Sequence, residues 1–236
     1  MVKVILSLAG MICICFTNIS WTDRLGDNSA IPTVEIGKGR APTIDGIVSE
    51  REWEDATVLK LGDDGRIYLK YDSQNLYIAT NSNIGNLFCH LGNRLYVYHA
   101  SNSLGMSAYL YHENHRLWTC RKRYHWELSR YEIRNRSAGE WLEMVEDYLV
   151  ENGWTANTKP MGRKGETEMV ISLNRLGLNP VIRKGKQRVA SILIGHHASN
   201  WPDGTHVSDA LRALKGGNNP ETLSIDSSNW GRIVLK

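Results

Sequence analysis

Two tryptophans lie in segments whose composition is poor for a core, and each could form a platform for a flat ligand. Trp154 follows the Asn-Gly stop of an expected helix, and Trp201 lies in the polar loop ASNWPDGTH. An exposed indole stacks on the apolar C–H face of a pyranose, while amide, carboxylate and imidazole groups bind its hydroxyls. His197, Asn200 and Asp203 stand beside Trp201 in the sequence. The pattern therefore favours a sugar-binding surface built by these five residues.

The other tryptophans divide between core and surface. Trp118, Trp126 and Trp141 can belong to either, and we include Trp118 among the candidate ligand contacts. Trp53 faces inward from a short capped helix, and Trp230 lies in the last expected strand, so both are expected in the core. The chain has 8 Trp and 10 Tyr but only 2 Phe, a bias that suits half-exposed surfaces gripping partly apolar ligands.

Polar residues gather at the end of the alternating strand RLYVYHA. His99 is followed closely by Ser101 and Ser103. Such a cluster can line a pocket, and a hydrogen-bonded core histidine explains it equally well. The histidine pairs at 112/115 and 196/197 are poorly spaced for one metal ion, because adjacent strand residues point to opposite faces and the i, i+3 spacing suits a helix. We therefore interpret those pairs as solvated or hydrogen-bonded.

Hard oxygen donors for calcium are present at Asp63, Asp64 and Asp203. Calcium is bound by several carboxylate and carbonyl oxygens. No twelve-residue calcium loop accompanies these acids, and the hypothesis of a structural calcium ion rests mainly on Asp63 and Asp64.

The sequence does not organise a catalytic site. It contains no Gly-x-Ser-x-Gly, His-Glu-x-x-His, P-loop or dinucleotide glycine motif. Glu50, Glu52, Glu166 and Glu168 are available carboxylates. A glycosidase needs two of them on opposite sides of the scissile bond, and Glu50 and Glu52 fit a helix start better. The pattern favours a binding protein over an enzyme and leaves the enzyme question open.

The first twenty residues resemble an export signal. Lys3 precedes an apolar run over 4–16 and a short polar stretch over 17–20, which is the layout of a secretory signal peptide. We expect a secreted, periplasmic or cell-surface protein. In an oxidising compartment Cys89 and Cys120 could form a disulfide, and two buried unpaired thiols are the alternative.

Length and charge narrow the class of protein further. The chain has 236 residues, a formal net charge of +3 and 42% hydrophobic residues, which indicates one globular domain over 21–236. So balanced a charge argues against nucleic acid as the main partner. After the leader no apolar stretch is long enough to cross a bilayer, so we expect no membrane insertion.

Short alternating segments dominate the rest of the chain. Ser49 and Glu52 form a capping box that predicts a short helix over 50–56, and a second helix is predicted over 140–150. Strands are predicted at Thr33–Ile36, in a hairpin over 67–80, at Arg94–Ala100, twice between 106 and 133, and over 167–173, 188–195 and 230–236. Many such strands predict an all-β fold, an antiparallel β-sandwich.

Four stretches resemble family 9 carbohydrate-binding modules and their relatives. They are TIDGIVSEREWEDA, KYDSQNLYIAT, TEMVISLNRLGL and NWGRIVL, in the family's order over most of residues 40–236. The resemblance implies a jelly-roll-like β-sandwich of the DOMON-like superfamily that binds sugar without catalysis and can hold structural calcium. The middle of the chain, 85–153, departs from the family pattern and points to a divergent branch.

Two alternatives to sugar binding stay open, and the resemblance implies the first of them. Relatives in the superfamily bind haem as redox modules, for which His99 with Met106, or His197, would be the iron ligands. A surface protein-interaction domain is the other alternative. Carbohydrate is the partner that the exposed-tryptophan pattern favours.

Overall fold

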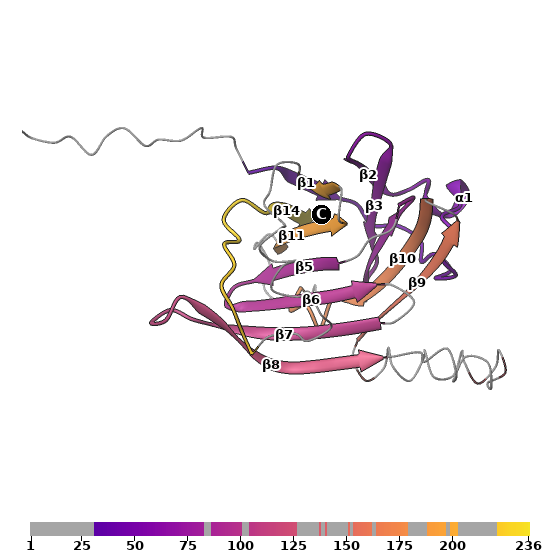
Figure 1. The fold of residues 1–236 in the computed structure, drawn as a ribbon. Helices are drawn as coiled ribbons and strands as arrows, with labels where there is room; N and C mark the ends of the chain where they lie inside the picture. Colours follow the sequence, from indigo (N-terminus) through magenta and orange to yellow (C-terminus); the bar gives the residue numbers. More distant parts are fainter. Residues whose placement is uncertain are drawn as a thin grey trace, which may run out of the picture. The chain divides into compact units, whose positions relative to one another are not determined.

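The computed structural model describes residues 31–82, 86–100, 104–126, 137, 140, 151, 153–161, 164–178, 188–196, 199–202 and 221–236 (Figure 1). All of them belong to one unit, Ile31–Lys236. The expected signal peptide and most of the helix expected over 140–150 lie outside these residues. Within the described part, no helix is long and apolar enough to cross a membrane.

The larger sheet has nine strands among the described residues. Its β5–β8 run is a meander in which each strand pairs with the next along the chain, side by side in Figure 1. The order is β1 (Thr33–Ile36), β14 (Gly231–Leu235), β11 (Arg188–His196), β5 (Asn86–Leu91), β6 (Arg94–Ala100), β7 (Leu104–His112), β8 (Leu117–Trp126) and β13 (Thr222–Leu223), with β12 (Ser199–Trp201) pairing to β11. Every pair is antiparallel except β1 with β14.

The smaller sheet has five strands, all antiparallel. Its order is β2 (Thr57–Leu61), β3 (Gly65–Tyr71), β4 (Asn75–Thr80), β10 (Lys164–Ser172) and β9 (Trp154–Met161). The β3–β4 hairpin turns at Asp72, whose Oδ1 accepts the backbone N–H groups of Gln74 and Asn75, both at 2.7 Å. An aspartate that bonds its own following backbone is the turn chemistry that the sequence predicted.

The two sheets enclose one apolar core. Alternation along β3 turns Ile67 and Leu69 inward, and residues of the larger sheet such as Leu87 and Ile192 meet them in the same buried cluster. A second apolar cluster covers the outer face of the larger sheet, and a third covers the outer face of the smaller one. The predicted β-sandwich is confirmed, and the described strands are buried on more than one face.

The predicted strands are present among the described residues, but β2, β5, β9, β12 and β13 were not predicted. The strands expected at Thr33–Ile36 and Arg94–Ala100 have those bounds, and β7 and β8 are the two strands expected in the next segment. The first helix, α1 (Glu50–Trp53), is shorter than expected; its Ser49 N-cap accepts the Glu52 N–H. Ser137 and Glu140 also form a capping box, with Ser137 N–H and Glu140 Oε2 2.7 Å apart.

Cys89 and Cys120 are not bonded to each other. Cys89 lies on β5 and Cys120 on β8, with two strands between them, so about 14 Å of sheet separates them. A disulfide needs Cα atoms within about 7 Å. The two side chains also pack against apolar clusters on opposite faces of the sheet. Of the two alternatives, the disulfide is therefore wrong for this fold.

We expect the Cys89 thiol to resist alkylation in the native protein. Burial raises the pKa of this thiol to about 12, and the thiolate is the reactive species. Iodoacetamide treatment at pH 8 followed by peptide mapping should leave Cys89 unmodified, and the same treatment in guanidinium chloride should modify it fully. Equal modification in both conditions, or a peptide containing a Cys89–Cys120 disulfide, would contradict this prediction.

Candidate binding site

The segment 40–56 covers the outer face of the smaller sheet. Alternation on β3 places Tyr68 and Lys70 on this face, opposite the core-facing Ile67 and Leu69. The α1 residue Trp53 packs there against Tyr77, Ala79 and Val170. The outer face of the smaller sheet, which would otherwise be solvated, is thus buried. The charged side chains on this face therefore need hydrogen-bond or ion-pair partners beneath α1.

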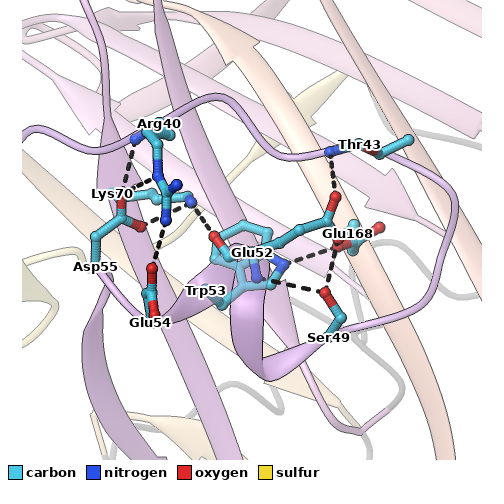
Figure 2. Close-up of polar contacts among 9 residues, drawn as sticks. All are labelled: Arg40, Thr43, Ser49, Glu52, Trp53, Glu54, Asp55, Lys70 and Glu168. Carbon is cyan, nitrogen blue, oxygen red and sulfur yellow. Dashed lines mark hydrogen bonds and ion pairs between the residues drawn. The ribbon is translucent and has the colours of Figure 1, made fainter.

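Glu168 on β10 is fully buried under this segment. Its Oε2 accepts the backbone N–H groups of Asp45 at 3.0 Å and Gly46 at 2.9 Å. Its Oε1 accepts the Trp53 indole N–H at 2.8 Å (Figure 2). Burial raises the pKa of Glu168, and the three N–H donors oppose that rise. A carboxylate that accepts three N–H groups fixes both the Ile-Asp-Gly turn and α1.

Lys70 on β3 is the buried cation of the same face. Its Nζ lies 2.9 Å from Asp55 Oδ1 and also donates to the Glu52 carbonyl. The ammonium stands 4.9 Å from the centroid of the Trp53 ring, within the range of a cation–π interaction. The Lys70 ammonium therefore connects β3 to Glu52 and Asp55, which lie before and after Trp53 in the sequence.

Asp55 also contacts Arg40. Its Oδ2 accepts the Arg40 backbone N–H at 2.8 Å, and the Arg40 guanidinium pairs with Glu54 (Figure 2). The chain comes this close because residue 39 is glycine: a Cβ there would lie 2.8 Å from Lys70 Cδ and 2.9 Å from Asp55 Oδ2. The position of Arg40 is therefore set from the buried side by Lys70 and Asp55.

A pocket of about 420 Å³ opens beside α1 on the solvent side of this network. Two guanidinium groups, a hydroxyl and a carboxylate surround it, and its lining residues are Arg40, Ala41, Ser49, Arg51 and Glu52. Hydrogen bonds from Thr43 lower the pKa of Glu52, and Ser49 Oγ donates to its Oε2 at 2.9 Å. Arg51 is exposed and forms no ion pair or hydrogen bond within the described part of the chain. The pocket thus presents ionised donors and an ionised acceptor.

The three tryptophans predicted as ligand contacts are buried. Trp154 is 0% exposed and Trp201 8%, so the prediction that their rings form an open platform is wrong. Trp118 is 3% exposed and belongs to the core, one of the two alternatives left open for it. Trp154 packs in the sandwich core with Tyr98, their ring centroids 5.1 Å apart. The Trp201 ring lies over Gly231, where a Cβ would collide with it. The expected core positions of Trp53 and Trp230 are confirmed.

The predicted polar partners of Trp201 are not brought into one site among the described residues. Asn200 is half-buried, and its amide donates to the Pro202 carbonyl. His197 and Asp203 lie outside the described residues. Their roles in ligand binding stay predictions.

His99 is exposed near the end of β6, on the face that Asn86 shares. Its Nδ1 lies 3.0 Å from Asn86 Oδ1. Ser101 and Ser103 lie outside the described residues. In the β6–β7 ladder, His99 pairs with Gly105 and Met106 pairs with Tyr98. The two residues proposed as haem ligands are therefore not paired across the strands, and the haem hypothesis gains no support from this register.

Asp63 and Asp64 are exposed in the turn between β2 and β3. They line a second depression of about 410 Å³, in which Lys60 and Arg66 stand near them. Within the described part of the chain, no group of three or more His, Cys, Asp or Glu side chains is placed to hold a metal ion. Calcium at this turn stays a prediction.

Sequence reasoning missed most of the residues that form the site. Ser49 and Glu52 were predicted as a capping box, and Glu168 was one of four carboxylates without an assigned place. Lys70 and Arg40 had no signal beyond their charge, because alternation alone assigns Lys70 to a solvated face. The available signal was Trp53: a buried indole N–H needs an acceptor, and an acid on a neighbouring strand can supply it.

Comparisons with known proteins returned structural likenesses only. No family model matches the sequence, and no curated protein matches it. A family 9 carbohydrate-binding module from Caldicellulosiruptor kristjanssonii in complex with cellotriose is 12% identical, with a TM-score of 0.40 over 86% of this chain and 93% of that chain. A family 9 module from the same organism in complex with glucose is 11% identical, with a TM-score of 0.41 over 86% of this chain and 95% of that chain. A candidate carbohydrate-binding protein from Bacteroides uniformis is 8% identical, with a TM-score of 0.39 over 87% of this chain and 99% of that chain.

Proposed function

We propose that this chain is a carbohydrate-binding β-sandwich protein whose sugar site is the polar pocket beside α1. The observation that carries the proposal is the set of groups around that pocket: Arg40, Arg51, Ser49 and Glu52 offer donors and acceptors over about 420 Å³. Pockets for small ligands span about 300–1,000 Å³. A sugar ring fits that size and carries hydroxyls that both donate and accept.

A rigid support makes the pocket suitable for a polar ligand. Glu52 belongs to α1, which is capped by Ser49, and Arg40 is held by Asp55. Groups that are already positioned lose little conformational freedom on binding, so more of the contact energy contributes to affinity. The resemblance of TIDGIVSEREWEDA to the opening of family 9 modules supports the proposal, since three of the five lining residues, Ser49, Arg51 and Glu52, belong to that stretch.

We propose further that this binding site is non-catalytic. The described carboxylates near the pocket already have partners: Glu52 accepts from Thr43 and Ser49, and Glu168 accepts three N–H groups. Glycoside hydrolysis needs an acid and a second carboxylate facing each other across the substrate. The leader over 1–20 supports export to a secreted, periplasmic or cell-surface location, where such ligands occur.

Replacing Arg51 with alanine should weaken sugar binding at least tenfold. Arg51 is exposed at the pocket and free to donate, and a hydrogen bond to a charged group contributes about 1.5–3 kcal/mol. The measurement is a glycan array followed by titration calorimetry with the best ligand, run with calcium and with a chelator. The chelator arm also tests the calcium hypothesis.

Arg66→Ala is the matched control for that experiment. Arg66 is an exposed arginine on β3 that lines the other depression, so its loss should leave sugar affinity unchanged. Equal losses of sugar affinity in Arg51→Ala and Arg66→Ala, or no glycan bound by the folded wild-type protein, would refute the proposed site.

A further inference from the structure

A serine and a histidine meet on the outer face of the larger sheet. Ser227 Oγ lies 2.8 Å from His90 Nδ1. His90 is the outward residue of β5 next to Phe88, at the margin of the second apolar cluster. Its imidazole stands edge-on to two indoles, with centroids 5.0 Å from Trp118 and 6.4 Å from Trp230. The pair belongs to a different sheet from the pocket beside α1 and takes no part in it.

The other ring nitrogen of His90 fixes the tautomer. Its Nε2 lies 2.6 Å from the Gly92 carbonyl oxygen, which can only accept a hydrogen bond. Nε2 must therefore carry the proton, and in the neutral imidazole Nδ1 is left as an acceptor. The hydroxyl of Ser227 is then the donor, so its proton points at a base.

Local structure holds Ser227 in this position while leaving it accessible. The Trp230 N–H donates to the Ser227 carbonyl at 3.3 Å, closing a turn, and the buried Trp230 ring anchors that turn to the sheet. Asp226 Oδ1 accepts the Ser228 N–H at 2.9 Å. Ser227 and His90 are both half-buried, whereas the neighbouring Ser228 is exposed.

We propose that Ser227 is a reactive nucleophile that His90 activates as a general base, with carboxylic esters as the class of substrate. A serine hydroxyl within hydrogen-bond reach of an imidazole that a third group orients is the arrangement of an activated nucleophile. Here the Gly92 carbonyl is the orienting group and also stabilises the imidazolium that forms.

The reaction balances with the groups present and water. Ser227 Oγ bonds to the ester carbonyl carbon while its proton moves to His90 Nδ1. The ester C–O bond then breaks, and the departing alkoxide takes that proton. Water, deprotonated by the same nitrogen, then attacks the acyl carbon. The bond from that carbon to Ser227 Oγ breaks, Oγ takes the proton back from His90 Nδ1, and the carboxylic acid is released. This activity acts on an ester bond and is independent of the proposed sugar binding.

The test is covalent labelling of the folded full chain. With a fluorophosphonate probe and, separately, p-nitrophenyl acetate, we expect peptide mapping to find the adduct on Ser227. General-base assistance contributes about 10²–10⁴-fold, so His90→Gln should slow labelling at least a hundredfold, with circular dichroism confirming the fold. Ser227→Ala should abolish the adduct, and Ser228→Ala should leave it unchanged.

Three results would overturn the proposal. They are no adduct on the folded wild-type protein, equal labelling of Ser227 and Ser228, and labelling of Ser227 at an unchanged rate in His90→Gln. Any of these would mean that the hydrogen bond between Ser227 and His90 only attaches the turn at 227–230 to β5.

Discussion

Replacing Glu168 with alanine is expected to lower the free energy of unfolding by about 3–5 kcal/mol, because it leaves buried N–H donors without an acceptor. Those donors are the backbone N–H groups of Asp45 and Gly46 and the Trp53 indole. In a domain of this size, a loss of 3 kcal/mol lowers Tm by about 6–12 °C. Thermal and urea unfolding followed by circular dichroism measure the effect.

Glu166→Ala is the matched control for this prediction. Glu166 lies two residues away on the same face of β10, is half-buried, and accepts one N–H, from Val48 at 2.9 Å. A single partly buried hydrogen bond contributes about 1 kcal/mol. Similar losses of unfolding free energy in Glu168→Ala and Glu166→Ala would show that burial and the number of donors do not determine the destabilisation.

Lys70→Met is expected to destabilise the protein by about 2–4 kcal/mol. The substitution keeps the length of the side chain and removes the ammonium that faces Asp55 and the Glu52 carbonyl. Breaking a fully buried ion pair costs about 3–5 kcal/mol. The Asp55 side chain is 26% exposed, so water compensates in part for its lost partner and the expected effect is smaller than for a fully buried pair. Lys60→Met, at an exposed lysine of β2, is the control and should be nearly neutral.

A double-mutant cycle isolates the interaction of Lys70 with Asp55. Lys70→Met combined with Asp55→Asn should be less destabilising than the sum of the single variants by about 1–3 kcal/mol. Strict additivity would mean that the two groups do not interact.

The same pair also makes the stability of the protein depend on pH. Burial by itself raises the pKa of Asp55, but the hydrogen bond from Lys70, the Arg40 N–H and the charge of Lys70 together bring it below its usual 3.8. The unfolded carboxyl therefore takes up its proton first as the pH falls. The stability difference between wild type and Asp55→Asn should be full at neutral pH and should shrink below about pH 3.8. A difference that grows on acidification would contradict this assignment.

The strands that were predicted, such as β3, β4 and β6, could be found because their signals are local. The Asp72 turn, the alternation in β3 and β4, and the Ser49–Glu52 capping box each depend on residues a few positions apart. The two sheets follow from the number and pattern of such strands. Which sheet face is covered depends on distant residues, and the sequence carries no local sign of it.

That difference explains the errors at Trp154 and Trp201. Trp154 begins β9, whose sequence WTANTKPM lacks hydrophobic alternation and is typical of a loop. Pairing with Ile171 of β10 nevertheless places Trp154 over the core. Trp201 forms a ladder pair with Ile194 through a three-residue strand in a loop-like sequence. In both cases a long-range strand pair, not the local composition, decides the burial.

Lys70 and Glu168 could not be predicted as buried for a related reason. Each alternates with core residues on its strand, and the side opposite a core is normally solvated. Here α1 covers that side, and the two charges are satisfied by Asp55, the Glu52 carbonyl and three N–H groups. The candidate pocket exists because this second layer holds Arg40 and Glu52 above the sheet.

The parallel pairing of β1 with β14 has a consequence for how the chain folds. Thr33 pairs with Arg232, and β14 also forms the ladder that connects β1 to β11. The edge of the larger sheet can therefore close only after β14 has been synthesised. Contacts between segments this distant in sequence slow folding, since the loop must close before any pairing energy is gained. Until then, the edge of β11 that pairs with β14 stays open to other strands, and the nascent protein is most prone to aggregate at that stage.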